Sequence, residues 1–458
     1  MDQWAPQADA QPGPAPFGRI PTWVPFGVLV AASGAATVLE RIPLPGDATR
    51  FAAAGAAILD GDLSSVYADT WMQGGPLELL GSLVWLPLAS QHPDIGTGFD
   101  FGGYPVPTDL ATGVVLALCV LGCVVLARRG TGLRGTVWPA LAALAVAAVT
   151  RLPAQTLLSG HLAQPMVAFG WVGAAVLALR GRALAAALAL GLCSAWEPWA
   201  LLAAPVLLLD PRLDLRQLRQ GPRSPLLARG ALVAAVFAAA TVAPYLPFVA
   251  TGHFALFEHR WPFITDSMVG HLMHRGTAVT WPWRLAQGAF TIAVGTLVVQ
   301  ALRSRRDVVW LAPFAIQVAR LLLDPLQLSY YWIPLLVLSV VGVGMLSSSA
   351  GRRGVGIVVA LLVLPQLQSL DERTWAPSSA ASAGLLATVA VLVLAVVQAR
   401  AGSSTNRNDS AAAPNASATT TPALSSEAGA GVGLPAPRPS AEPPSTPSAA
   451  TIRAGWKR

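Results

Sequence analysis

The chain has 458 residues, of which 54% are hydrophobic and only 12% are charged, and its mean hydropathy is +0.55. This composition indicates an integral membrane protein and argues against a set of ordinary soluble domains. Thirty basic residues against 23 acidic residues give a formal charge of +7, but Lys457 is the only lysine. The arginines gather in short loops, so they indicate membrane topology and not a nucleic-acid-binding surface.

The two ends of the chain differ in composition from its middle. Residues 1–20 are rich in proline, and residues 401–458 are rich in Ala, Ser, Thr and Pro without an apolar period. Such segments bury too little apolar surface to fold, so we predict a disordered N-terminus and a disordered cytoplasmic tail. No cleavable signal sequence is evident, and residues 21–400 form the predicted membrane-embedded domain.

Apolar runs long enough to cross a bilayer recur through the middle of the chain. We therefore predict an all-α fold, a polytopic membrane bundle with about 12 crossing helices. The run 183–209 contains the sequence WEPW at 196–199, and a proline after a charged residue is expected to break this run into a hairpin of two short helices. The other predicted spans are 22–39, 108–127, 136–152, 163–179, 229–250, 285–302, 308–323, 330–346, 354–370 and 380–397.

Arginine clusters in the short loops predict the orientation of this bundle. They lie at 128–134, 180–182, 212–229, 303–306 and 352–353. If all of these loops face the cytoplasm, the number of crossings between successive clusters is even and both termini are cytoplasmic. We therefore predict a multi-pass protein of the cell membrane. Its remaining loops lie on the extracytoplasmic side and contain most of the polar side chains that could bind or react with a substrate.

The first outer loop, at 45–80, is polar and carries five of the 23 acidic residues. Carboxylates beside a bilayer are costly and are often functional, which makes Asp47 a candidate. Asp60 and Asp62 occur in the sequence DGD, which is typical of turns and helix caps. The apolar run 77–89 is too short to cross a bilayer comfortably, so it predicts a re-entrant or juxtamembrane helix.

Other outer loops supply candidate substrate-binding residues. His161 and Gln164 lie one helical turn apart at the start of a span, where they could bind a sugar or a phosphate or cap the helix. Glu197 lies in the predicted break, where a carboxylate either faces a cavity or holds the hairpin by pairing. Arg151 and Arg320 lie near the outer ends of spans, where arginine either binds a phosphate or extends to the interface.

No metal and no cofactor are expected from the motifs. The sequence has no Walker motif, no dinucleotide-binding fingerprint and no His-rich metal signature. His271 and His274 have the spacing of a metal-binding pair in the long loop 251–284, but no acid or cysteine supports them there. All three cysteines lie inside apolar runs, which predicts packed or lipid-facing thiols and neither a metal site nor a disulfide.

Four short elements, taken in order, resemble those of a known family. The first reads GDATR at 46–50 and continues as ILDGDLSSVYA at 58–68. The second reads GHLAQ at 160–164, the third is the WEP of the predicted broken helix, and the fourth reads DPLQLSYY at 324–331. Over residues 20–400 this order resembles the polytopic GT-C glycosyltransferases, in particular the actinobacterial polyprenyl-phosphate-mannose-dependent alpha-1,2-mannosyltransferases.

The resemblance implies a GT-C-like bundle that takes a sugar, mannose being the expected one, from a polyprenyl phosphate donor on the extracytoplasmic face. The acceptor would be a glycolipid or a cell-wall glycan. The resemblance also implies that Asp47 is the general base. The expected partners are membrane lipids, this donor and this acceptor, without nucleic acid. The candidate substrate-binding residues are His161, Gln164, Glu197, Arg320, Asp324, Tyr330 and Tyr331.

Three positions depart from the family pattern. His161 stands where the family has Gln, Gln164 where it has Asn, and Glu197 where it has Lys, which reverses a charge. If the lysine of the family contacts the donor phosphate, this chain uses another cation, such as Arg320 or Arg151, or another donor. A transporter or flippase for a lipid-linked substrate and a non-catalytic family member are the alternative predictions.

Overall fold

The computed structural model describes residues 46–85, 106–132, 160–214, 223–263, 267–270, 278–303, 310–326, 328–346, 360 and 384–397. All of them belong to the first of two compact units, Met1–Asn408. Every regular element among the described residues is a helix, apart from one isolated bridge, so the predicted all-α class is confirmed. The predicted spans 22–39 and 136–152, almost all of 354–370 and both predicted disordered ends lie outside these residues.

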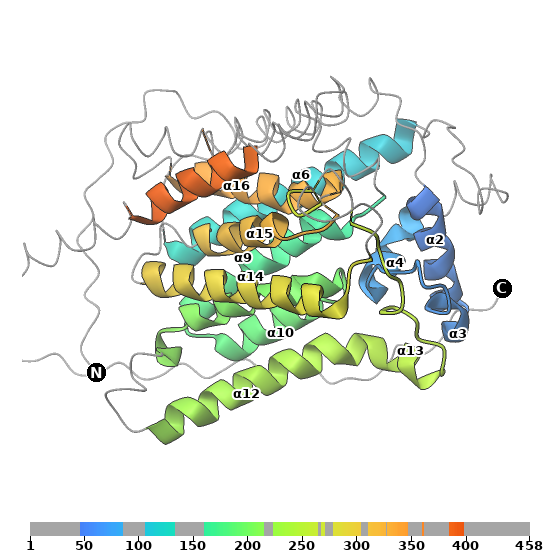
Figure 1. The fold of residues 1–458 in the computed structure, drawn as a ribbon, viewed down its shortest axis with the longest axis horizontal. Coiled ribbons are helices and arrows are strands. Elements are labelled where there is room, and N and C mark those ends of the chain that lie inside the picture. Colours follow the sequence, from blue (N-terminus) through green and yellow to red (C-terminus); the bar gives the residue numbers. More distant parts are fainter. Residues whose placement is uncertain are drawn as a thin grey trace, which may run out of the picture. The chain divides into compact units, whose positions relative to one another are not determined.

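Apolar helices packed side by side make up most of the described structure (Figure 1). The helix α9 contacts α6, α10 and η2, and α14 contacts α15 and η2. Their shared core contains large side chains that are fully buried, among them Trp171, Trp310 and Trp332. The bounds are α6 Val106–Thr131, α9 Ala163–Leu179, α10 Ala183–Cys193, the 3₁₀ helix η2 Pro198–Leu209, α12 Arg223–Val242, α14 Trp281–Leu302, α15 Leu311–Leu322 and α16 Ile333–Leu346, with a further apolar helix at Gly384–Val397.

A second group of short helices precedes this bundle in the chain. The sequence predicted a polar loop at 45–80, but the structure has a 14-residue helix there, α2. The segment FAAAGAAI at 51–58 explains the difference, because its alanines favour a helix and its apolar side packs against α4 and η1. The bounds are α2 Gly46–Leu59, α3 Leu63–Val66, α4 Pro76–Gly81 and the 3₁₀ helix η1 Ser82–Trp85. Within the predicted short helix at 77–89, residues 77–85 are helical in α4 and η1, and 86–89 lie outside the described residues.

The predicted break in the apolar run 183–209 is confirmed. Helix α10 ends at Cys193 and η2 begins at Pro198, with Glu197 in an extended conformation at φ −147° and ψ 121°. A residue before proline is pushed towards this conformation by contact with the proline ring. The backbone amide of Gly75 donates to the Trp196 carbonyl at 3.1 Å, and that of Leu77 donates to the Ala195 carbonyl at 2.8 Å. The start of α4 therefore pairs with the end of α10, and each satisfies terminal groups of the other.

Proline also divides the predicted span 229–250. This segment is observed as α12 followed by the 3₁₀ turn η4, Ala243–Tyr245, and by α13, Leu246–Ala250. Both short elements carry a proline within their first two positions. Because proline lacks an amide hydrogen and is best tolerated in a first turn, the helix restarts there instead of running on straight.

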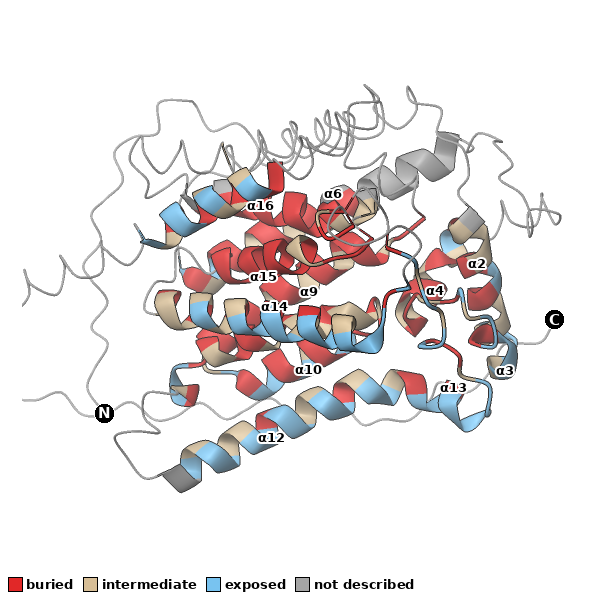
Figure 2. Ribbon diagram, in the orientation of Figure 1, coloured by how far each residue is buried: buried red, intermediate tan, exposed pale blue. Residues whose placement is uncertain are grey.

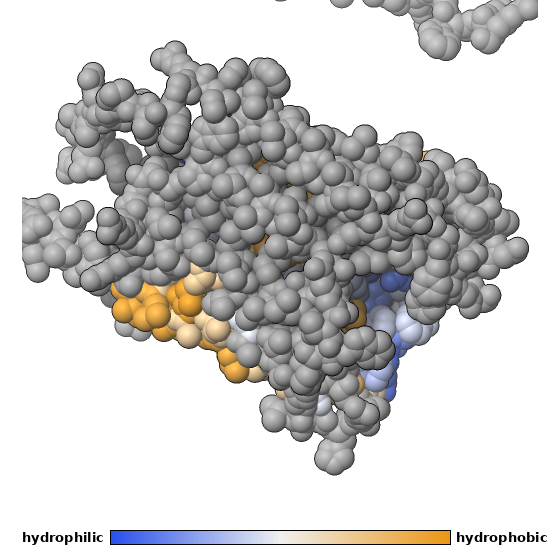
Figure 3. Space-filling model, turned by 90° about the horizontal axis from the view of Figure 1, so that it is seen from above, coloured by the Kyte–Doolittle hydropathy of each residue, from blue (hydrophilic) through white to orange (hydrophobic). Residues whose placement is uncertain are grey.

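Two described helical segments are long and apolar enough to cross a membrane: Pro225–Ala250, which runs through α12, η4 and α13, and Trp281–Leu302, which is α14. Figure 2 shows α12 with a long exposed surface, whereas α9 and α15 are largely buried. Large apolar side chains on the two candidate helices are exposed, including Leu227, Leu232 and Leu297, the last 70% exposed. In Figure 3 the described residues visible on one face separate into a hydrophobic side and a hydrophilic side. Such exposed apolar surface is consistent with contact with lipid. Two helices do not test the predicted count of crossings.

Gly75 should be sensitive to any added side chain. A Cβ atom at this position would come within 2.2 Å of the Ala195 carbonyl oxygen, which is held by the hydrogen bond to Leu77. We expect Gly75→Ala to reduce the free energy of unfolding by about 1–3 kcal/mol, as overpacking does, and to lower the Tm measured by fluorescence in detergent.

Gly173→Ala in α9 is the matched control, because a Cβ there meets no atom within 4 Å. Its Tm should stay the same or rise, since alanine favours a helix over glycine. A wild-type Tm for Gly75→Ala would show that the stability of the protein does not depend on the close backbone contact between α4 and the end of α10.

Candidate active site

Four ionisable side chains meet beside the break in α10. We call Asp47, Glu78, His161 and Glu197 the carboxylate cluster. Asp47 lies in the first turn of α2, Glu78 in α4, His161 just before α9 and Glu197 in the break. Three atoms able to bind a metal ion, one each from Glu78, His161 and Glu197, lie within 4.8 Å of one another. Residues far apart in the sequence thus form one charged group.

His161 is the centre of this cluster. Its Nδ1 lies 3.2 Å from Glu78 Oε1, and its Nε2 lies 3.7 Å from Asp47 Oδ2. The ring stacks on Tyr330 with a centroid distance of 4.1 Å and an interplanar angle of 23°. Burial by itself lowers the pKa of the imidazole, but the carboxylates of Glu78 and Asp47 outweigh it and raise the pKa of His161 to about 10. The side chain is therefore held as a cation between two acids.

The turn that carries His161 fits closely against α2. Gly160 has a φ of +66°, and a Cβ atom there would come within 2.7 Å of the Ala48 backbone nitrogen. Glycine is the residue that adopts this left-handed conformation at least cost, and it leaves room for the α2 backbone. The close approach brings His161 next to Asp47.

Asp47 is the accessible acid of the carboxylate cluster, with its side chain 48% exposed. Burial of the carboxyl opposes ionisation, but the hydrogen bond and charge of His161, together with the charge of Arg50, hold the pKa of Asp47 below its usual range. Its position in the first turn of α2 also favours the negative charge, because the amide dipoles of the helix point their positive end there. Asp47 is therefore ionised and can be reached from outside the protein.

Glu78 and Glu197 are the buried acids of the cluster. Glu78 Oε1 accepts a hydrogen bond from the Ala163 amide at 3.3 Å, whereas Oε2 is buried without a hydrogen-bond partner among the described residues. Glu197 Oε2 accepts from Gln164 Nε2 at 3.3 Å. Burial, and then the neighbouring Glu78 carboxylate, raise the pKa of Glu197. The positive charges of His161 and Arg320 only partly offset this effect on Glu197.

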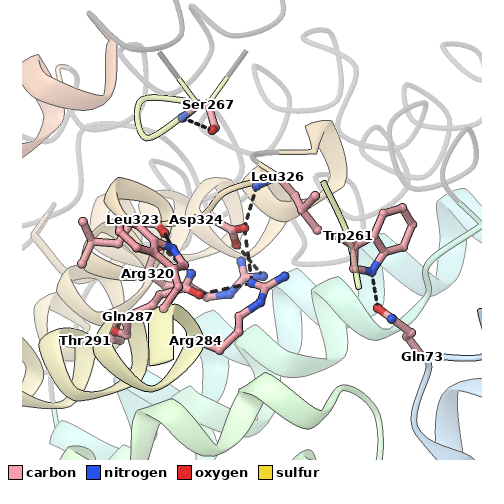
Figure 4. A network of polar contacts seen from close by, with 12 residues as sticks. Gln73, Trp261, Ser267, Arg284, Gln287, Thr291, Arg320, Leu323, Asp324 and Leu326 are labelled. Carbon is pink, nitrogen blue, oxygen red and sulfur yellow. Dashed lines mark hydrogen bonds and ion pairs between the residues drawn. The ribbon is translucent and has the colours of Figure 1, made fainter. Parts of the chain in front are cut away.

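Two arginines and one acid form a second group, which we call the arginine cluster: Arg284, Arg320 and Asp324 (Figure 4). The buried Arg320 lies 3.1 Å from Asp324 Oδ2 through Nη2, and the partly exposed Arg284 lies 3.7 Å from Asp324 Oδ1. Asp324 also accepts a hydrogen bond from the Leu326 amide at 3.0 Å, and Gln287 donates to the Arg320 carbonyl at 3.1 Å. The cluster therefore carries a net charge of one positive unit.

Aromatic rings join the two clusters. The guanidinium carbon of Arg320 lies 3.8 Å from the ring centroid of Trp199 and 4.1 Å from that of Tyr331. Trp199 follows Glu197 by two residues, and Tyr331 packs edge-on against Tyr330, which covers His161. Stacking on electron-rich faces stabilises a buried guanidinium. The carboxylate and arginine clusters are thus parts of one continuous site.

All eight residues that the sequence analysis selected for the site lie in these two clusters or in direct contact with them. The separate interpretation of Asp60 and Asp62 as turn and cap residues is confirmed for the turn, in which Gly61 has a φ of +81°. Asp62 occupies the N-cap position of α3, but its side chain accepts from the Ser64 hydroxyl and makes no cap hydrogen bond to the backbone of α3. The cysteines are free thiols, without a disulfide. Arg151 and the pair His271 and His274 lie outside the described residues.

Sequence reasoning missed three residues of the site, Glu78, Trp199 and Arg284. The one usable signal was at Glu78, an acid inside an apolar run, where a carboxylate is costly. Trp199 and Arg284 gave no such signal, because tryptophan and arginine near the ends of apolar runs are ordinary interfacial residues. Their contacts with Arg320 and Asp324 come from elements that only folding brings together.

No family model matches the sequence, and no curated protein matches it either. The resemblance to GT-C glycosyltransferases therefore rests on the short sequence elements alone.

Asp324 should be essential for stability because it is the counter-ion of the buried Arg320. Removing one partner of a buried ion pair leaves an uncompensated charge, so Asp324→Asn is expected to reduce the free energy of unfolding by about 3–5 kcal/mol. Denaturation in detergent, followed by tryptophan fluorescence, measures the loss. The double variant Asp324→Asn/Arg320→Met should recover part of it.

Asp214→Asn is the comparison variant, since Asp214 pairs with Arg303 at 2.7 Å but is partly exposed. Its loss should be smaller, because water can solvate the remaining arginine. Equal losses for the two single variants would contradict the assignment of a buried, strongly coupled pair to the arginine cluster.

Proposed function

We propose that this chain is an integral membrane glycosyltransferase that moves a sugar, expected to be mannose, from a polyprenyl phosphate donor to a glycolipid or cell-wall glycan acceptor. The observation that carries the proposal is that one continuous site contains both an accessible, ionised carboxylate, Asp47, and the partly buried arginine cluster. A base and an anion-binding group are the two parts that transfer from a lipid phosphate requires.

In the proposed reaction Asp47 takes the proton of an acceptor hydroxyl. The hydroxyl oxygen then forms a bond to the anomeric carbon of the sugar, and the bond between that carbon and the phosphate oxygen breaks. The electron pair leaves with the polyprenyl phosphate. Asp47 suits the role of base because it is half-exposed and is kept ionised by His161.

The arginine cluster is the proposed site for the donor phosphate. Nη1 of the buried Arg320 has no hydrogen-bond partner among the described residues, and the Arg284 side chain is 32% exposed. Guanidinium groups bind phosphate through paired, charge-assisted hydrogen bonds. With two arginines and one aspartate, this cluster would supply the positive charge that the family places on a lysine at the position of Glu197.

The proposed setting is a multi-pass bundle of about 12 crossing helices, with both termini in the cytoplasm and this site on the extracytoplasmic side. Two candidate crossing helices and the exposed apolar side chains of the bundle support a membrane location. By the positive-inside rule, the segments that carry Asp47, His161 and Glu197 lie on the extracytoplasmic side.

A transporter or flippase for a lipid-linked substrate is the second candidate function, and the broken helix favours it. Interrupted helices with a charged residue at the break line substrate paths in transporters. Glu197 has this position between α10 and η2. Purified protein in vesicles separates the two functions, because an enzyme yields a glycosylated product whereas a flippase only moves the donor between leaflets.

Replacing the proposed base tests the catalytic assignment. Asp47→Asn keeps the shape of the side chain but cannot accept the proton, so the rate of mannose transfer from polyprenyl phosphate mannose should fall about 10²- to 10⁴-fold. The assay measures radiolabelled mannose in membrane glycolipids at matched expression. Asp60→Asn, an exposed acid at the end of α2, should keep wild-type transfer. Unchanged transfer in Asp47→Asn would remove this residue as the base.

Replacing the accessible arginine tests the donor-phosphate site. Arg284→Gln removes one charge that faces the proposed phosphate, so the KM for the donor should rise about 10-fold or more, the effect of losing a charged hydrogen bond worth roughly 1.5–3 kcal/mol. Arg260→Gln, on an exposed loop, is the control and should leave the KM unchanged. A wild-type KM in Arg284→Gln would place the donor phosphate elsewhere.

A further inference from the structure

Glu78, His161 and Glu197 have the spacing of ligands around one metal ion. Two ligand atoms that each lie about 2.1 Å from an ion and roughly 90–110° apart are separated by about 3.0–3.4 Å. The distance between His161 Nδ1 and Glu78 Oε1 is 3.2 Å, and one ligand atom each from Glu78, His161 and Glu197 can be chosen so that all three lie within 4.8 Å of one another. A small movement of the Glu197 side chain would bring its carboxylate oxygen within bonding distance of the same ion.

The hydrogen bonding around these residues is incomplete in the way that a ligand site requires. Glu78 is fully buried, yet its Oε2 has no hydrogen-bond partner among the described residues. Gln164, which donates to Glu197, is also fully buried and its Oε1 has no such partner. Buried polar atoms are nearly always paired, so two acceptor oxygens left in one cluster point to a cationic ligand.

The other nitrogen of His161 faces a carboxylate, the kind of group that accepts from a metal-bound imidazole. Histidine ligands usually donate their second ring N–H to a carboxylate, which fixes the orientation of the ring and strengthens the metal bond. Here Nε2 lies 3.7 Å from Asp47 Oδ2 while Nδ1 is directed to Glu78. Tyr330 stacks on the ring and further limits its rotation.

The charges of the cluster also call for a cation. Three carboxylates, of Asp47, Glu78 and Glu197, surround one imidazolium, with Arg50 3.9 Å from Asp47 and the charge of Arg320 acting on Glu197. A metal ion at Nδ1 would take the place of the proton held there, which leaves to solvent. Buried carboxylates without sufficient opposing charge are strongly unfavourable. A divalent ion would balance both buried acids.

We propose that Glu78, His161 and Glu197 bind a divalent cation beside the break between α10 and η2. Two carboxylates with one imidazole form a mixed oxygen and nitrogen set, which suits Mn²⁺ or Zn²⁺ better than Mg²⁺ or Ca²⁺, whose sites consist of oxygen ligands. The proposal rests on the geometry of these residues and holds independently of the sugar-transfer reaction.

The test uses the full chain purified in detergent, stripped with a chelator, incubated with Mn²⁺ or Zn²⁺ and passed over a desalting column. Elemental analysis should then find about one ion per wild-type chain, as for a single site. Glu78→Gln and Glu197→Gln should each bind the ion at least about 10-fold more weakly, since each removes a charged ligand. Glu258→Gln changes an exposed acid outside the cluster and should bind like wild type.

A spectroscopic measurement on the wild type avoids any effect of the variants on folding. Electron-spin-echo spectra of the Mn²⁺-loaded protein should show coupling to one imidazole nitrogen, from His161. Three results would each overturn the proposal. They are a wild-type protein that retains no ion, Glu→Gln variants that retain as much ion as the wild type, and a Mn²⁺ signal without nitrogen coupling.

Mannose transfer is measured on the same samples but decides only the proposed function. Ion retention with the expected ligand dependence supports the metal site even where no sugar is transferred. Transfer by a wild-type protein that binds no ion would support the enzyme and overturn the metal site.

Discussion

The backbone pairing between the start of α4 and the end of α10 is the constraint on which the site depends. Both partners carry polar groups that a helix end leaves unsatisfied, and burial makes such groups costly. The hydrogen bonds of Gly75 and Leu77 to Trp196 and Ala195 satisfy them together. This contact brings Glu78 near Glu197, and it leaves no room for a Cβ atom at position 75.

Charge explains why the site takes its particular form. Buried acids and arginines are stable only when opposite charges or hydrogen bonds compensate them, and here each compensating group comes from another element of the chain. His161 faces acids on α2 and α4. Asp324, which follows α15, pairs with Arg284 of α14 and Arg320 of α15. The aromatic rings of Trp199 and Tyr331 cover Arg320 and connect the two halves. A site built in this way requires the whole bundle to be folded.

Prediction from sequence succeeded where a single local rule dominates. Proline at 198 and the extended residue before it predicted the broken helix, and the apolar run at 163–179 predicted α9 with its observed bounds. It failed at α2, because the acidic residues of 45–80 favoured a loop although the alanines there favour a helix. It also failed to select Glu78 for the site. The importance of that residue comes from His161 and Ala163, which lie more than eighty positions away. Local patterns contain no information on such distant contacts.

The sequence by itself determined the helical class, the break before Pro198 and the residue types available for chemistry, because composition, apolar period and proline geometry act over a few neighbouring residues. Only the tertiary structure decided that Asp47, Glu78, His161 and Glu197 meet, and that Arg320 is held between two aromatic rings beside Asp324. The physical reason is that the side-chain charges and polar atoms buried here find their partners in space, and those partners come from segments far apart in the chain.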